Sequence, residues 1–236
     1  MRRTTRRASR RWMGRVTALV VLFGLVFAAW LWWDMREWRP DATLYPEQGA
    51  LVPPGGGPVR FETLKAVGAQ FVYLPLLAGP GADGPGGFAD RFTLARAAGL
   101  QVGVMLPFDP CARADAQSGM FAQMVPRDPD LLPPAIGLAR LAESCDPKVS
   151  DAAVESELMT LINQIEMHSG KPVILKLEPA FQERHDSAGT LGRDLWLARD
   201  RARPDYAGRP WLLWSANSAR FTEASEEPVE WVVVQK

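Results

Sequence analysis

The chain has 236 residues, of which 47% are hydrophobic, and its formal net charge is zero. This length allows one domain with a sizeable core and a short additional segment. A neutral balance excludes the strongly basic surface that a nucleic-acid-binding domain needs, so we expect no nucleic-acid partner.

The first 15 residues are strongly basic, whereas the rest of the chain is acidic. Seven of them are arginine and none is acidic, which leaves 20 basic and 27 acidic residues beyond position 15. The uncharged stretch Val16 to Trp33 follows, and as a helix it would span roughly 27 Å, close to the thickness of the bilayer core. Trp30, Trp32 and Trp33 lie at its far end, where indoles favour the membrane interface.

This arrangement predicts a basic cytoplasmic tail at 1–15, a transmembrane signal anchor at 16–33 and an extracytoplasmic or periplasmic remainder, because basic flanks stay in the cytoplasm. The alternative is a cleaved signal peptide. However, the apolar stretch is longer than an ordinary signal peptide core, and its end, "FAAWLWW", offers no small-x-small cleavage site. We therefore expect a single-pass protein of the cytoplasmic membrane.

Residues 34–41 are predicted to be a linker, and residues 42–236 alternate between helical and strand-like segments. Helical spacing of apolar residues or terminal glycines predicts helices at 60–70, 88–99 and 150–170. Continuous apolar runs predict strands at 71–77, 100–106, 132–139, 171–177 and 228–236. Residues 189–200 are expected to form a short helix or turn.

Strands that alternate with helices indicate an α/β fold, and uniformly apolar strands indicate a parallel sheet covered on both faces. About 196 residues is small for a complete (β/α)₈ barrel, which typically has about 250. We therefore predict a reduced, irregular TIM-type barrel. The glycine-rich stretch Gly79 to Gly87 lacks the spacing of a nucleotide-binding loop, so we expect a loop at the barrel mouth and no cofactor.

Seven short segments match landmarks of a known family in order: "QG" (Gln48–Gly49), "LKAVGAQFVYL", "ARAAGLQVGVMLPF", "LPP", "GKPVIL", "LWLAR" and "PWLLW". On these segments the chain resembles glycoside hydrolase family 25. That resemblance implies an irregular β/α barrel and muramidase (lysozyme) activity, the cleavage of the glycan strands of peptidoglycan.

The residues that carry the family's chemistry differ. Its central strand reads L-P-P-V-L-D-x-E, and Gly137 and Ala139 stand where it has the two acids. Residues two apart on a strand face the same side, and a retaining glycosidase needs such a pair of carboxyl groups. By the same resemblance Thr43 replaces the first-strand aspartate. We therefore predict a domain that is degenerate at its catalytic positions.

Further positions at the mouth have lost their polar residues. By the resemblance, Pro75 and Ala78 replace a lysine and a glutamate, and Met105 and Leu106 replace a tyrosine and a histidine. Asn217 ends the segment "WSAN", which replaces W-Q-Y-S. These replacements make a polar mouth apolar, which suits protein packing better than a sugar.

Other carboxylates are candidates for a relocated catalytic pair. Glu178 follows a predicted strand, where barrel enzymes place catalytic groups. Asp109 and Glu47 lie in comparable loops, and Glu230 stands where the family has an aspartate. The alternative roles are a turn residue for Asp109 and a solvated strand end for Glu178.

Ligand binding has three candidates, Trp214, Trp211 and Glu47. The two indoles could stack on sugar rings or pack in the core. Two histidines, His168 and His185, are too few for a zinc site with two distant cysteines, so we expect no metal.

The two cysteines, Cys111 and Cys145, are candidates for a disulfide in an oxidising compartment, the alternative being two free thiols.

Three functions stay open at this stage. The domain binds peptidoglycan or an envelope protein without cleaving glycan; or it is an active peptidoglycan hydrolase that uses Glu178, Glu230 or Asp109; or it is a structural spacer whose barrel mouth is filled by its own side chains.

Overall fold

The computed structural model describes residues 4–54, 57–77 and 87–235, and it forms two compact units, Met1–Trp38 and Arg39–Lys236. Ala78 and most of the predicted mouth loop, residues 79–86, lie outside the described residues.

The first unit is the helix α1, Thr4–Glu37, about 51 Å long. Its segment Arg15–Glu37 is long and apolar enough to cross a membrane, and its side chains are exposed. The helix continues through residues 34–37, so the first four residues of the predicted linker are helical. One contact that favours the extra turn is between Arg36 and the Trp32 ring, one turn away, at 4.2 Å.

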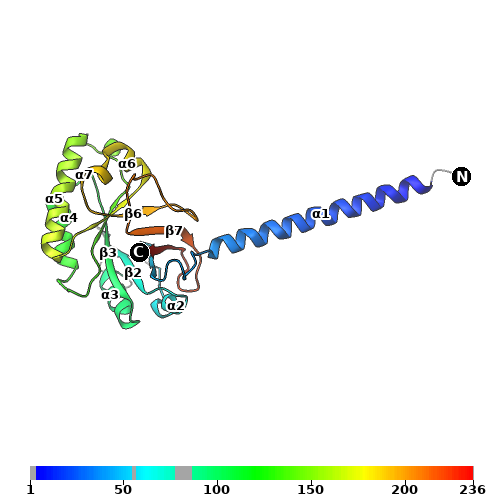
Figure 1. Cartoon of the computed structure of the whole chain (residues 1–236), viewed down its shortest axis with the longest axis horizontal. Coiled ribbons are helices and arrows are strands. Elements are labelled where there is room, and N and C mark those ends of the chain that lie inside the picture. Colours follow the sequence, from blue (N-terminus) through cyan, green and yellow to red (C-terminus); the bar gives the residue numbers. More distant parts are fainter. Residues whose placement is uncertain (1–3, 55–56, 78–86, 236) are drawn as a thin grey trace. The chain divides into compact units, whose positions relative to one another are not determined.

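The second unit is a closed barrel of eight strands in chain order, with β1 to β7 parallel and β8 antiparallel to both β7 and β1 (Figure 1). Its strands are β1 Gln48–Leu51, β2 Phe71–Pro75, β3 Gln101–Pro107, β4 Ala135–Leu138, β5 Ile174–Leu177, β6 Asp194–Ala198, β7 Leu213–Arg220 and β8 Val229–Val234. The predicted α/β barrel of irregular type is confirmed.

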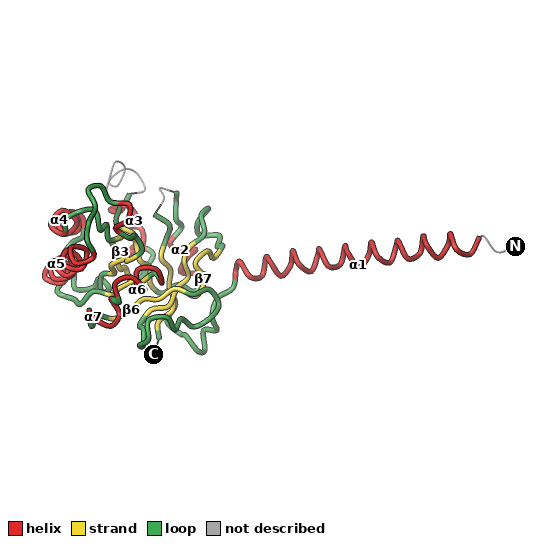
Figure 2. The backbone as a smooth tube through the Cα atoms, turned by 90° about the horizontal axis from the view of Figure 1, so that it is seen from above, coloured by secondary structure: helices red, strands yellow, loops and turns green. Residues whose placement is uncertain are grey.

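Helices cover the outside of the barrel unevenly. They are α2 Phe61–Ala66, α3 Phe88–Ala97, α4 Ala114–Met124, α5 Asp151–Ser169, α6 Pro179–His185 and α7 Ser187–Thr190, with a 3₁₀ turn η1 at Ala142–Ser144. Both views show α4 and α5 side by side (Figures 1 and 2). Residues 199–212, between β6 and β7, form no helix, which makes the barrel a reduced one.

Aromatic side chains occupy the place of the missing helix. The Tyr206 hydroxyl donates to the Leu177 carbonyl at 2.5 Å and accepts the Ala198 N–H at 3.1 Å, so it joins the ends of β5 and β6. Burial raises the pKa of Tyr206 to about 12. The Trp211 indole donates to the Pro204 carbonyl at 3.2 Å and thereby fixes the far end of this connection.

Whereas α4 and α6 were not predicted, the helix α5 shows what makes a helix predictable from the sequence. The Ser150 hydroxyl caps its first turn by accepting the Ala153 N–H, and Gly170 ends it with a φ of 69° that favours glycine. Val154, Leu158 and Ile165 lie on its buried face at helical spacing.

The strand β6 falls where a short helix or turn was predicted, at 189–200. Its apolar core is only three residues long, Leu195 to Leu197, all fully buried. So short an apolar run carries no period that separates a buried strand from a helical turn.

Side chains from nearly every strand fill the barrel interior, and they show which face of each strand points inward. The buried members of this cluster are Leu51, Phe71, Tyr73, Ala135, Ile174, Trp196, Leu213 and Val232. Because alternate residues of a strand share a face, the next inward positions toward the mouth are Gly137, Lys176, Ser215 and Glu230.

Candidate functional site

A polar cluster lies on the inner face at the mouth, the end where the parallel strands β1 to β7 finish. Its centre is the Lys176 ammonium on β5, 3.2 Å from a Glu230 carboxylate oxygen and 3.6 Å from a Glu178 carboxylate oxygen. Glu230 enters from the start of β8, whereas Glu178 directly follows β5 and stands at the N-cap position of α6, where its side chain makes no capping hydrogen bond. The structure thus brings together two of the three acids predicted as a relocated pair.

A hydrogen-bond chain fixes Glu230 from the opposite side. The Trp196 indole N–H donates to the Ser215 hydroxyl at 2.6 Å, and that hydroxyl donates to the Glu230 carboxylate. Trp196 and Ser215 are fully buried, and the Lys176 ammonium also lies 5.7 Å from the centre of the Trp196 ring. The rigid inner wall therefore holds Glu230 in one orientation.

The cluster pairs one cation with two carboxylates. Glu230 accepts a hydrogen bond from the Ser215 hydroxyl and lies 3.2 Å from the Lys176 ammonium. The Lys176 and Glu230 side chains are only 13% and 16% exposed, whereas Glu178, at 38%, is open toward solvent. Both carboxylates are therefore within ion-pair distance of the same ammonium.

Gly137 and Ala139 stand at the mouth end of the central strand, as the sequence predicted, and neither offers a carboxylate. Gly137 is on β4, and Ala139 is exposed one residue beyond its end. A Cβ atom at Gly137 would lie 3.1 Å from the Met105 sulfur, so the Met105 side chain has taken part of the space that an acid would use. The inner wall is apolar at this point.

Thr43 does not occupy the first strand, so this part of the sequence interpretation was wrong. It is exposed in a turn, where its N–H donates to the Asp41 carboxylate at 2.8 Å, and β1 begins only at Gln48. A first-strand acid would have to stand at Leu51, the inward residue at the mouth end of β1. The conclusion that the first strand offers no acid is therefore unchanged.

Glu47 lies at the wrong end of the barrel for its predicted role in ligand binding at the mouth. It precedes β1, and parallel strands begin at the end opposite the mouth. Its carbonyl accepts the Val234 N–H at the end of β8, which confirms that position.

Asp109 follows β3 and holds a loop rather than joining the Lys176 cluster. One of its carboxylate oxygens accepts from Arg140 at 2.7 Å and from the Cys111 N–H at 2.9 Å. Cys111 forms a disulfide with Cys145, which links the loops after β3 and β4 across 34 residues. Closing a loop of this length stabilises a fold by about 3–4 kcal/mol.

Trp214 and Trp211 lie on the outside of the barrel. Because Leu213 and Ser215 face inward, Trp214 between them faces outward. It is buried, its indole donates to the Arg199 carbonyl at 2.8 Å, and its ring centre lies 5.9 Å from that of Trp211. Of the two roles that the sequence left open, these contacts correspond to packing: the indoles cover the barrel where a helix is missing.

Sequence reasoning missed Lys176 and Ser215. A signal was present in "ILKLE", because a lysine two residues before Glu178 on an apolar strand shares its inward face. The segment was interpreted as a uniformly buried strand, and the side on which the lysine falls was not considered.

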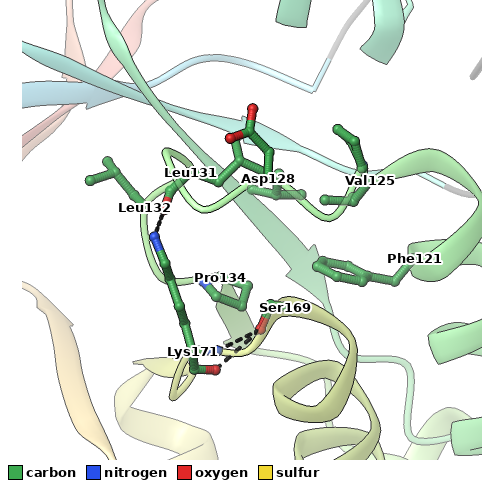
Figure 3. Close-up of a pocket in the computed structure, with 10 residues that line it drawn as sticks. Phe121, Val125, Asp128, Leu131, Leu132, Pro134, Ser169 and Lys171 are labelled. Carbon is green, nitrogen blue, oxygen red and sulfur yellow. Dashed lines mark hydrogen bonds between the residues drawn. The ribbon is translucent and has the colours of Figure 1, made fainter.

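A small space at the opposite end of the barrel can be set aside as a substrate site. It lies between α4 and the segments that precede β4 and β5, lined by Phe121, Leu132 and Lys171 among others (Figure 3). Its volume is about 10 Å³, room for one water molecule at most. The Lys171 ammonium donates to the Leu131 and Pro129 carbonyls, so it serves the loop.

Comparisons with known proteins agree on the architecture. No family model and no curated protein sequence matches the chain. A family 25 glycosyl hydrolase from Bacillus anthracis is similar in structure, with a TM-score of 0.72 at 20% identity, over 85% of this chain and 93% of that one.

Two further solved structures are similar. A bacterial lysozyme from Streptomyces coelicolor has a TM-score of 0.64 at 14% identity, over 80% of this chain and 92% of that one. The spore cortex lytic enzyme SleM from Clostridium perfringens has a TM-score of 0.65 at 17% identity, over 83% and 69%. The second unit, Arg39–Lys236, therefore has the fold of the family 25 lysozymes and muramidases.

Proposed function

We propose that the protein is a membrane-anchored, lysozyme-like domain that binds peptidoglycan without cleaving it. The observation that carries this proposal is that the Lys176 ammonium pairs with both Glu178 and Glu230. The two acids nearest to a relocated catalytic pair are therefore already engaged by a cation, whereas a retaining glycosidase needs one of them as a proton donor and the other as a nucleophile.

Two further observations support the absence of hydrolysis. The central strand has Gly137 and Ala139 in place of an acid pair, and Met105 fills space beside Gly137. The loss of a general acid alone typically removes about 10²–10⁴-fold of rate. The fold is that of proteins named lysozymes and muramidases, which makes cell-wall polymer the best-supported ligand.

The proposal includes the place of the domain in the cell. The apolar helix α1 serves as the anchor, its basic end stays in the cytoplasm, and the barrel lies in the periplasm or outside the cell. The Cys111–Cys145 disulfide suits an oxidising compartment.

A peptidoglycan assay on the whole protein in detergent micelles tests the proposal. We expect the protein to sediment with insoluble peptidoglycan while the number of reducing ends stays at the level of a heat-inactivated control. Turnover above that control would contradict the proposal. If no more protein sediments with peptidoglycan than without it, the third function is favoured, a spacer or a surface for an envelope protein.

The second candidate, a relocated hydrolase, is favoured by the closeness of Glu178 and Glu230. It predicts release of reducing ends that Glu178→Gln and Glu230→Gln each abolish. Asp109→Asn is the matched control, because the Asp109 carboxylate pairs with Arg140 and not with Lys176.

A further inference from the structure

A separate cavity lies beside the mouth loops and shares no residue with the Lys176 cluster. It is enclosed by the connection between β4 and α5, the first turn of α5 and the C-terminal end of α6, and its volume is about 240 Å³. Leu141 and Val149 form part of its lining, and Glu143, Lys148, Arg184 and His185 provide its polar groups.

The charges around this cavity are only partly paired with one another. Arg184 forms a two-pronged ion pair with Asp151, at 2.7 Å and 3.1 Å. The hydrogen bonds from Arg184 to Asp151, and more weakly the nearby Glu143, raise the pKa of Arg184. Neither Glu143 nor Lys148 has a hydrogen bond or ion pair with any residue in the described ranges. One anion and one cation therefore line the same small cavity without reaching each other.

The wall of the cavity includes a buried polar atom without a partner. The His185 side chain is 2% exposed, and its Nδ1 atom forms no hydrogen bond with the described part of the chain. The nearest carboxylate oxygen, on Glu155, is 3.6 Å away, too far for a hydrogen bond. A buried polar group without a partner is unfavourable, and a bound ligand with a polar group would give it a partner.

We propose that this cavity binds a small zwitterion, a molecule with one ammonium and one carboxylate group such as a short peptide or a free amino acid. Glu143 pairs with the ammonium, Lys148 pairs with the carboxylate, and His185 offers a further hydrogen bond. The volume lies just below the range of about 300–1,000 Å³ that is usual for ligand pockets, which limits the ligand to a small molecule.

Ligands with a single charge fit this cavity less well. An anion would face Glu143 and Asp151, and a cation would face Lys148 and Arg184. An uncharged ligand would leave both unpaired charges without a partner. The proposal does not depend on the proposed function, because no residue of the cavity belongs to the mouth cluster.

The probe for the test is the dipeptide Ala-Ala, with the full-length protein in detergent micelles. Saturation-transfer NMR detects the bound dipeptide, and a titration gives its dissociation constant. The controls are N-acetyl-Ala-Ala, which lacks the ammonium, and Ala-Ala amide, which lacks the carboxylate. We expect the dipeptide to bind and each control to bind at least about tenfold more weakly.

Two substitutions locate the site. Glu143→Gln and Lys148→Met should each weaken binding of the dipeptide about tenfold or more. Glu62→Gln, an exposed acid on α2, should leave it unchanged. All three side chains are exposed, and an unchanged unfolding temperature shows that each variant is folded. Absence of a saturation-transfer signal, equal binding of the blocked dipeptides, or equal binding by both site variants would overturn the proposal.

Discussion

At the scale of single residues, Lys176 determines how the charges at the barrel mouth are paired. An ammonium on the inner face of a barrel strand is costly to desolvate, and here it lies against two carboxylates that offset that cost. The ion pairs that offset the cost of burying the lysine also engage Glu178 and Glu230, the two carboxylates that could have acted in glycan cleavage. The mouth is therefore stabilised as a closed ionic cluster.

Lys176→Met should lower the free energy of unfolding by about 2–3 kcal/mol, because Glu230 would remain buried without its cation. The measurement is urea denaturation of the protein in micelles, followed by tryptophan fluorescence. The double variant Lys176→Met, Glu230→Gln should recover part of the loss, because no buried charge is left unpaired.

Arg140→Met is the matched control for that experiment. It breaks the Arg140–Asp109 pair, whose side chains are about half exposed, so the cost should stay below about 1 kcal/mol. Equal losses of unfolding free energy for Lys176→Met and Arg140→Met would show that the mouth cluster is solvated. They would contradict the view that Lys176 compensates a buried carboxylate.

Gly137→Asp tests whether the inner face of β4 has room for an acid at this position. A Cβ atom there meets the Met105 sulfur at 3.1 Å, so the aspartate should destabilise the protein by about 1–3 kcal/mol through overpacking and burial of a charge. The combined variant Gly137→Asp, Ala139→Glu should release no reducing ends from peptidoglycan.

Adding Met105→Ala to Gly137→Asp should return part of that stability, measured as the urea midpoint, since it removes the atom that the new side chain meets. A variant with Gly137→Asp alone that is as stable as the wild type would show that the inner wall repacks freely at this position.

At the scale of elements, the sequence predicted the helices α3 and α5 and the most apolar strands, because their pattern is repeated over several turns or residues. The helices α4 and α6 were not predicted. The strand β6 was missed because its apolar core, Leu195 to Leu197, is too short to show a period. Thr43 was misplaced because the matched "QG" motif itself forms the start of β1, Gln48–Gly49. Lys176 was missed because the face of its strand was not considered, and because its partner Glu230 comes from a distant strand, which no local pattern reports.

Glu166 ties three elements together and should make their packing sensitive to acid. From α5 it accepts the Val173 N–H before β5 at 3.0 Å and two N–H groups of Arg193 before β6, at 2.6 and 2.9 Å. Burial raises the pKa of Glu166, but the Arg193 and Val173 hydrogen bonds and the Arg193 charge outweigh it, so the pKa lies below the ordinary 4.5.

A depressed pKa in the folded state means that the carboxylate stabilises the fold above pH 4.5, and that this stabilisation is lost as the pH falls through the folded-state pKa. Glu166→Gln should therefore cost about 1–2 kcal/mol at pH 7. Urea denaturation at pH 7 and near pH 3 measures the difference from the wild type, which should shrink at the lower pH. A difference that stays constant with pH would contradict the role of the Glu166 charge.

At the scale of the whole molecule, the chain combines a helix that can cross a membrane with a barrel that folds around its own core. If α1 is an uncleaved anchor, the protein should stay in the membrane fraction after a high-pH carbonate wash, and deletion of residues 1–38 should release it. An N-terminal tag should remain attached in cells. Loss of the tag together with release of the barrel would show that residues 1–38 act as a cleaved signal.

The orientation of that anchor rests on the seven arginines before Val16. Since basic flanks stay in the cytoplasm, protease added to cells with an opened outer envelope should digest the barrel and spare an N-terminal tag. Replacing Arg6, Arg7, Arg10 and Arg11 with glutamine removes most of the charge difference across the span and should produce a fraction of molecules with the opposite protection pattern. Protection of the barrel in the wild type would place it in the cytoplasm. In that compartment the Cys111–Cys145 disulfide would be exposed to reduction and peptidoglycan would be out of reach, so this one measurement bears on the anchor, the disulfide and the proposed ligand together.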